Sequence, residues 1–196
     1  MLYGPPREST AAFDMGTVLH ASALPGENPD EISVRMPEGM KKTTKEGKAF
    51  VAEHKGKIIL NPSDAHIVDQ MMLSLREHPF SASLVNGELS GKAEQSFFCT
   101  DPETGLELKA RPDFLMDDLS LIIDLKTTVD ASPKGFQRSV ANYRYYCQAS
   151  HYLDVVEGAT GTRPQAFLFV AVEKVRPFST AVYMADQAMI DLGKQQ

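Results

Sequence analysis

The stretch from residue 111 to residue 128 constrains the fold of this chain more strongly than any other part of it. It reads Arg-Pro-Asp-Phe-Leu-Met-Asp-Asp-Leu-Ser-Leu-Ile-Ile-Asp-Leu-Lys-Thr-Thr, so an apolar run that begins at Leu119 ends in an acid and a base, Asp124 and Lys126. Alternate side chains of a β-strand project to the same face, about 7 Å apart along the strand. We therefore expect Asp124 and Lys126 to share one face of a largely buried strand.

A second acid lies upstream of this strand. Asp113, in the dipeptide Pro112-Asp113, is near the end of another strand-like segment, residues 106–115, and the loop at Asp117-Asp118 can fold the two strands together. Two carboxylates and one ammonium would then share a small space, which suits a divalent cation on oxygen ligands with a lysine beside its bound water. Taken alone, the pattern is equally compatible with an ordinary surface salt bridge.

A helix with two regularly spaced polar residues is predicted next. Ser132-Pro133 has the composition of an N-cap followed by a first helical position, and the helical pattern stops near Gly158 or Gly161. Gln148 and Tyr152 are four residues apart, so they lie on one face of this helix. For Tyr152 a packing role is the alternative, because a tyrosine on an apolar helix face packs by default.

These three motifs, in this order, resemble a known enzyme group. Pro112-Asp113, Asp124-Leu125-Lys126 and Gln148-x-x-x-Tyr152 are similar to the motifs of the PD-(D/E)XK nuclease superfamily, in its RecB-like branch. The chain is most similar to the RecE (exonuclease VIII) and lambda-type phage recombination exonucleases, specifically over residues 88–185 and more loosely over residues 10–80. The resemblance implies an α/β (mixed α+β) fold, in which a central mixed β-sheet is flanked by helices around a restriction-endonuclease-like core.

The resemblance also implies a metal site and roles for its residues. Glu94 would complete the site, unless it is a surface acid on an edge strand, and His20 would match the family's helical histidine, unless it packs in the core. Lys126 would orient the attacking water and offset charge on the phosphoryl oxygens, and Gln148 and Tyr152 would position the phosphate or terminal nucleotide. One or two Mg²⁺ ions, which Mn²⁺ could replace, would be held by Asp113, Asp124, the backbone carbonyl of Leu125, Glu94 and His20.

The order of the expected elements fits a mixed sheet with helices on its faces. Three strands are followed by a helix and then by further strands. We treat residues 1–196 as a single domain, with a helical N-terminal part over residues 1–80 and a catalytic core over residues 88–185. The expected helices are 14–24, 41–56, 63–77, 132 to about 158 and a short one from 186, and the expected strands are 93–100, 106–115, 119–126, 166–173 and 179–184.

Composition bounds the class of protein. A chain with 42% hydrophobic and 23% charged residues is typical of a globular domain. No apolar stretch approaches the roughly 20 residues that cross a bilayer, and the first residues lack the basic and apolar parts of a signal peptide. Two cysteines can form neither a disulfide framework nor a four-cysteine iron–sulfur site. We expect a cytoplasmic protein, encoded by a bacterial host or by a phage or prophage, without a membrane partner.

The charge distribution bears on DNA as a partner. A net charge of −6 argues against DNA, because attraction to phosphates needs positive charge. Locally the balance reverses, since six lysines lie between Lys41 and Lys57 against two glutamates. We expect this segment to contact DNA, with a merely solvated helix face as the alternative. The expected DNA contacts are Lys41, Lys42, Lys45, Arg111 and Lys134.

The resemblance implies a Mg²⁺-dependent 5′→3′ exodeoxyribonuclease, which degrades one strand of linear double-stranded DNA and leaves 3′ overhangs for single-strand annealing recombination. Relatives of this type form rings on DNA, so we expect a trimeric or tetrameric homo-oligomer that acts on DNA ends with a RecT- or Bet-like single-strand annealing protein. Only nine residues precede Thr10, where the RecE type usually has another helix. Two alternatives stay open: a repair or restriction-type endonuclease of the same fold, and a non-catalytic phage DNA-binding protein.

Overall fold

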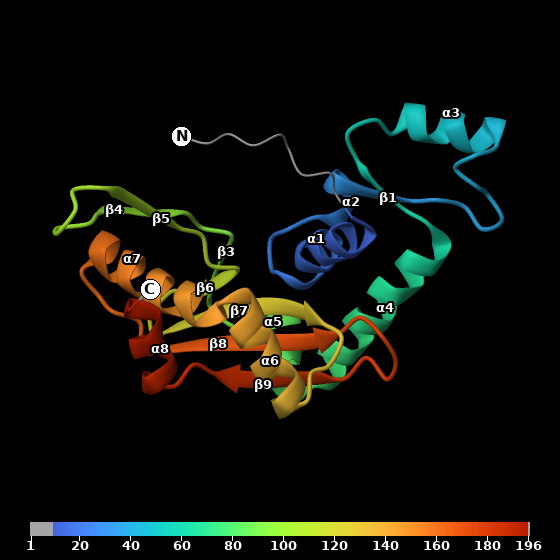
Figure 1. The fold of residues 1–196 in the computed structure, drawn as a ribbon. Coiled ribbons are helices and arrows are strands. Elements are labelled where there is room, and N and C mark those ends of the chain that lie inside the picture. The colour runs from blue at the N-terminus through green and yellow to red at the C-terminus, as the bar shows by residue number, and fades with distance from the viewer. Residues whose placement is uncertain (1–9, 196) are drawn as a thin grey trace.

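A mixed five-stranded sheet forms the centre of the molecule (Figure 1). The computed structural model describes residues 10–195. The strand order is β3-β6-β7-β8-β9, and only the β7–β8 pair is parallel. This confirms the predicted mixed sheet. Its strands are β3 (Gly91–Ala93), β6 (Phe114–Met116), β7 (Leu121–Thr128), β8 (Ala166–Glu173) and β9 (Thr180–Met184).

Helices cover both faces of this sheet, and the alternation along β7 divides the core in two. Ile123 and Leu125 pack with α1, α4 and α5 on one face, whereas Ile122 packs with α6, α7 and α8 on the other. Asp124, two residues after Ile122, therefore faces the α7 layer. The covering helices are α1 (Ala11–Ala23), α4 (Pro62–Glu77) and α5 (Pro79–Val85), and then α6 (Pro133–Tyr143), α7 (Tyr145–Thr160) and α8 (Gln187–Lys194).

Two small sheets extend from this body. β1 (Ser33–Arg35) and β2 (Ile58–Leu60) form a parallel pair, while β4 (Phe97–Thr100) and β5 (Glu107–Ala110) form a hairpin that packs on α7. The chain between β1 and β2 carries α3 (Lys45–Glu53), which stands away from the central sheet in Figure 1. A short helix, α2 (Pro29–Ile32), precedes β1. The N-terminal part predicted as helical thus also holds a pair of short strands.

Several predicted elements end at breaks that the pattern did not indicate. The expected strand 93–100 is two strands in different sheets, because the chain turns at Glu94, whose φ is 54°. The expected strand 106–115 is likewise divided into β5 and β6. The long helix predicted from residue 132 is interrupted at Arg144, which lets α6 and α7 both pack on one sheet face. The lysine-rich helix begins only at Lys45, after the Thr44 cap.

Candidate active site

The site is built on the open edge of β7. β6 pairs with β7 only at Ile122 and Ile123, whereas β8 pairs with β7 along its whole length. Beyond Ile123 the edge that faces β6 is therefore free for side chains. Asp113, just before β6, uses it: Asp113 Oδ2 accepts a hydrogen bond of 2.7 Å from the Leu125 backbone N–H. Because the N–H and C=O of a strand residue point to the same edge, the Leu125 carbonyl also opens toward Asp113.

Asp124 is fully buried between a lysine and a glutamine. Its Oδ1 accepts a hydrogen bond of 2.6 Å from Gln148 Nε2, and its Oδ2 lies 2.6 Å from Lys126 Nζ. Burial, together with repulsion from Asp113, raises the pKa of Asp124 to about 6, and the ammonium of Lys126 offsets only part of this effect. A second cation next to Asp124 would relieve the remaining cost of ionising this carboxyl.

Lys126 is held as an ammonium. Burial lowers the pKa of Lys126, but the attraction and hydrogen bond of Asp124 outweigh burial, so the net shift is upward. Its Nζ also lies 4.8 Å from the centre of the Tyr145 ring, within cation–π range. A lysine that stays protonated donates hydrogen bonds and does not remove protons. Lys126 is therefore suited to orienting a water molecule and stabilising phosphoryl oxygens.

Three further ligand groups converge beside this pair. His20 on α1, Glu94 after β3 and Asp113 each offer one ligand atom, and these atoms lie within 4.8 Å of one another. His20 Nδ1 lies 3.4 Å from Asp113 Oδ2. Burial lowers the pKa of His20, but the hydrogen bond to Asp113 and the negative charges of Asp113 and Asp124 together outweigh it, so the net shift is upward. Burial raises the pKa of Glu94. Two carboxylates and an imidazole form a donor set that fits a divalent metal ion.

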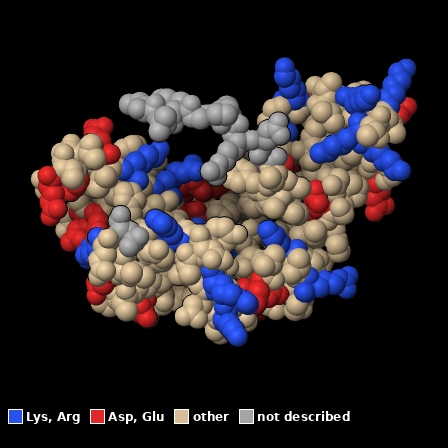
Figure 2. Space-filling model, in the orientation of Figure 1, with Lys and Arg blue, Asp and Glu red and all other residues tan. Residues whose placement is uncertain are grey.

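A cavity of about 330 Å³ opens next to this cluster. His20, Glu94 and Arg111 lie on its wall, and Thr17, Ala21, Leu24, Glu27 and Ile32 complete the lining. Arg111 Nε lies 2.9 Å from Glu94 Oε2, so the guanidinium stands at the edge of the acidic group. Figure 2 shows acidic atoms recessed near the middle of this face, with basic atoms beside them. Arg111 thus places a positive charge at the rim of the acidic group, where a phosphate can approach.

The comparisons with known proteins agree with this geometry. Residues 3–196 match the family model described as a PDDEXK-like domain of unknown function (DUF3799). The chain belongs to this family. The predicted PD-(D/E)XK membership is thereby confirmed, and family and fold together support a nuclease. The finer likeness to the RecE type stays a prediction.

One solved structure has a similar fold over almost the whole chain. A candidate exonuclease from Eubacterium rectale superposes with a TM-score of 0.65 at 14% identity, over 97% of this chain and 65% of that chain. The present chain thus spans about two thirds of that protein. An alkaline exonuclease from Laribacter hongkongensis also matches, at 14% identity and a TM-score of 0.36, over 83% of this chain and 82% of that one. No curated protein matches the sequence.

Three of the predicted DNA-contacting lysines of this PDDEXK-like domain, Lys41, Lys42 and Lys45, lie on the α3 arm, which we define as residues 37–57. Figure 2 shows basic atoms gathered over it. Lys42 Nζ donates to the Ile59 carbonyl, so this ammonium is tied to β2. Lys41 and Lys45 are exposed. The arm is separate from the acidic cluster, so its contact with DNA stays a prediction about a second surface.

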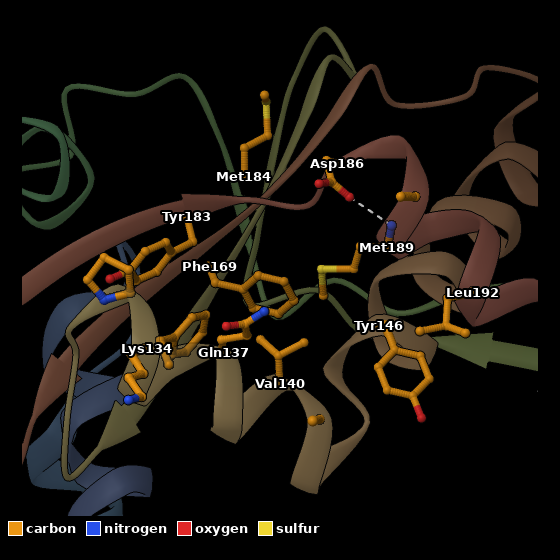
Figure 3. A pocket seen from close by; sticks show the side chains of 14 residues that line it. Lys134, Gln137, Val140, Tyr146, Phe169, Tyr183, Met184, Asp186, Met189 and Leu192 are labelled. Atoms are coloured by element: carbon orange, nitrogen blue, oxygen red, sulfur yellow. Dashed lines mark hydrogen bonds between the residues drawn. The ribbon is translucent and has the colours of Figure 1, made fainter.

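Lys134, the remaining predicted contact, lies at a different cavity. This cavity of about 780 Å³ is bounded by α6, β9 and α8 and is lined mainly by apolar and aromatic side chains such as Phe169, Tyr183 and Met189 (Figure 3). Lys134 is the one predicted site residue on its wall. The structure therefore does not bring Lys134 to the cluster of His20, Glu94 and Asp113.

Tyr152 and Tyr145 complete the site. Tyr152 packs near Phe167 with ring centroids 6.2 Å apart, and burial raises its pKa, so it shares in the core as well as supporting Gln148. Tyr145, under Lys126, was not among the predicted residues, because it follows a helix break that the sequence pattern does not reveal.

In the described part of the chain, no helix is both long and apolar enough to span a bilayer.

Proposed function

We propose that this PDDEXK-like protein is a divalent-metal-dependent exodeoxyribonuclease. The observation that carries the proposal is the convergence of Asp113, Asp124 and Lys126 on the open edge of β7, with Leu125 donating to Asp113 at 2.7 Å. Carboxylates and a charged lysine around a potential metal position suit phosphodiester hydrolysis. A binding module has no need to bury an acid whose pKa is raised to about 6.

Each group has a place in the proposed hydrolysis. Mg²⁺, or Mn²⁺ in its place, supplies Lewis acidity and lowers the pKa of bound water. Asp113, Glu94 and His20 would hold one ion, with Asp124 and the Leu125 carbonyl as the neighbouring ligands. Lys126 orients the attacking water and neutralises charge on the phosphoryl oxygens. Gln148 positions Asp124 through its 2.6 Å hydrogen bond.

The finer proposal is 5′→3′ digestion of one strand of linear double-stranded DNA, leaving 3′ overhangs for a RecT- or Bet-like annealing protein. Its support is the resemblance of the 88–185 segment and the separation of the α3 arm from the acidic cluster. Repeating a basic arm around a trimeric or tetrameric ring would retain DNA between cuts without a basic patch at the active site itself. Light scattering that shows a monomer, together with distributive digestion under a DNA trap, would contradict the ring.

The direct test uses linear duplex labelled at either 5′ or 3′ ends, alongside closed circular DNA of the same sequence, with Mg²⁺, Mn²⁺ or EDTA. We expect metal-dependent release of nucleotides from the 5′ end of linear DNA only. The variants Asp113→Asn and Asp124→Asn should lose this activity while remaining folded by circular dichroism. Nicking of the circle would favour the endonuclease alternative, and DNA binding without hydrolysis would favour the non-catalytic one.

A further inference from the structure

An aromatic stack runs from the catalytic lysine to solvent. Lys126 Nζ lies 4.8 Å from the centre of the Tyr145 ring. Tyr143 stacks on Tyr145, with the two ring centroids 5.6 Å apart and the ring planes at 25°. Tyr145 also stacks on the buried Phe169, at 5.7 Å and 25°, which fixes the inner ring. The outer ring belongs to a side chain that is 69% exposed.

The backbone between the two tyrosines makes this stack possible. Residues i and i+2 of a continuous helix point to nearly opposite sides and cannot face each other. Arg144, which lies between them, adopts the left-handed conformation with φ 54° and ψ 43°. This residue ends α6 and begins α7, and the turn at it lets the two rings stack with their planes 25° apart. Non-glycine residues adopt that conformation rarely, so a functional reason for it is worth testing.

Positive charge lies at or near the stack. Lys126 Nζ lies over the Tyr145 ring, the exposed Arg144 stands between the two tyrosines in sequence, and α7 begins at Tyr145 with the electropositive end of its dipole. Laid end to end, the Lys126–Tyr145 and Tyr145–Tyr143 distances of 4.8 and 5.6 Å place the Tyr143 ring no more than about 10 Å from the Lys126 ammonium, a span that a few nucleotides of one strand can cover. A strand whose phosphate reaches Lys126 can therefore place a nearby base on Tyr143.

We propose that the exposed face of Tyr143 stacks an unpaired base of the DNA strand being cut, while Arg144 contacts a phosphate of that strand. This inference rests on the proposed nuclease function and adds its substrate form: a DNA end with at least one unpaired nucleotide. Stacking on an aromatic ring is tolerant of sequence, since every base has a π-face, but it requires a base that is free of its partner strand. The site thus favours frayed or single-stranded ends over blunt ones.

The test measures binding in EDTA, so that hydrolysis plays no part. The probes are a fluorescein-labelled 12-nucleotide single strand and the same strand with abasic sites, which keep the phosphates but lack bases. Tyr143→Ala should weaken binding of the intact strand by about 5- to 150-fold and leave binding of the abasic strand unchanged. Tyr143→Phe, which keeps the ring, should bind both strands as the wild type does.

Matched variants separate stacking from charge. Phe98→Ala removes another exposed aromatic ring, 61% exposed on the β4–β5 hairpin, and should change neither affinity. Arg144→Gly is compatible with the left-handed backbone; it should weaken both strands alike and reduce the salt dependence by about one phosphate contact. Equal losses of Tyr143→Ala on intact and abasic strands, or no loss on either, would overturn the stacking proposal.

The parallel hydrolysis assay keeps the two proposals distinct. With Mg²⁺, the wild type should digest duplexes with mismatched ends faster than blunt duplexes, and Tyr143→Ala should lose this preference. Wild-type hydrolysis without any such preference would refute base stacking on Tyr143 but not the proposed nuclease activity. A wild type that hydrolyses nothing with either Mg²⁺ or Mn²⁺ would refute the nuclease, and the binding comparison would still decide whether Tyr143 stacks a base.

Discussion

Asp124→Asn should make the metal-free protein less sensitive to pH. The pKa of the buried Asp124 carboxyl is raised from 3.8 to about 6, so the folded state holds a proton that the unfolded chain releases. Stability from this group is present below about pH 4 and is lost as the pH rises through about 6. A shift of roughly two units corresponds to about 3 kcal/mol. The carboxamide of the variant does not ionise, so the variant lacks this loss.

Urea unfolding in EDTA from pH 4 to 7.5, followed by far-ultraviolet circular dichroism because the chain has no tryptophan, measures the difference. Relative to the wild type, Asp124→Asn should gain about 2.5 kcal/mol between the two ends of this range, because at pH 4 the carboxyl of the unfolded chain is already partly ionised. Glu103→Gln, at an exposed hairpin position, is the control. Parallel pH profiles of wild type and Asp124→Asn would refute the reasoning.

The same experiment with Mg²⁺ tests whether the metal ion binds next to the Asp124 carboxylate. At 100 times its dissociation constant, a ligand that binds only the folded state adds about 2.7 kcal/mol of stability. Mg²⁺ should therefore stabilise the wild type at pH 7.5, above the pKa of about 6 of Asp124, and have much less effect on Asp124→Asn. Equal stabilisation of the two proteins would place the ion elsewhere.

Three other changes test the site, the arm and the fold. Lys126→Met should lower kcat by about 100- to 1000-fold, as expected for loss of a donor to developing charge, with little change in DNA affinity; a loss confined to binding would contradict its role. Replacing both Lys45 and Lys48 with alanine should weaken DNA binding and reduce its salt slope by about two, and an unchanged slope would exclude the α3 arm. Gly193→Ala should cost about 1–3 kcal/mol in urea unfolding, because a Cβ there would collide with the Tyr146 carbonyl on α7; unchanged stability would mean that α8 packs differently.

Elements with strong local signals could be predicted from the sequence. The predicted helix 63–77 is confirmed as α4 (Pro62–Glu77), whose N-cap Asn61 accepts through Oδ1 from the Asp64 N–H at 2.9 Å, and the predicted cap Ser132 accepts from the Gly135 N–H at the start of α6. β7 and β8 lie where their apolar runs indicated. These features depend on hydrogen bonds and periodicities within a few residues, which is why a single sequence is sufficient to locate them.

The breaks at Glu94 and Arg144 could not be predicted. Both are non-glycine residues with φ of 54°, a conformation that local sequence disfavours. Contacts distant in sequence hold them there: the Glu94 N–H donates to the Asp113 carbonyl at 3.1 Å, and the Tyr143–Tyr145 stack spans Arg144. Tertiary structure overrides the helix and strand propensities at these positions, and both lie beside the candidate site.

The sequence by itself determined which chemical groups this protein brings to its site and that Asp124 and Lys126 share a strand face, because that follows from the two-residue period of a strand. Only the tertiary structure decided that Asp113 reaches the Leu125 N–H, that Gln148 reaches Asp124, and that His20 joins Glu94. Those distances depend on where β6 stops pairing with β7 and on how α1 and α7 pack against opposite faces of the sheet. Such packing is set by contacts between residues far apart in the chain, which no local pattern encodes.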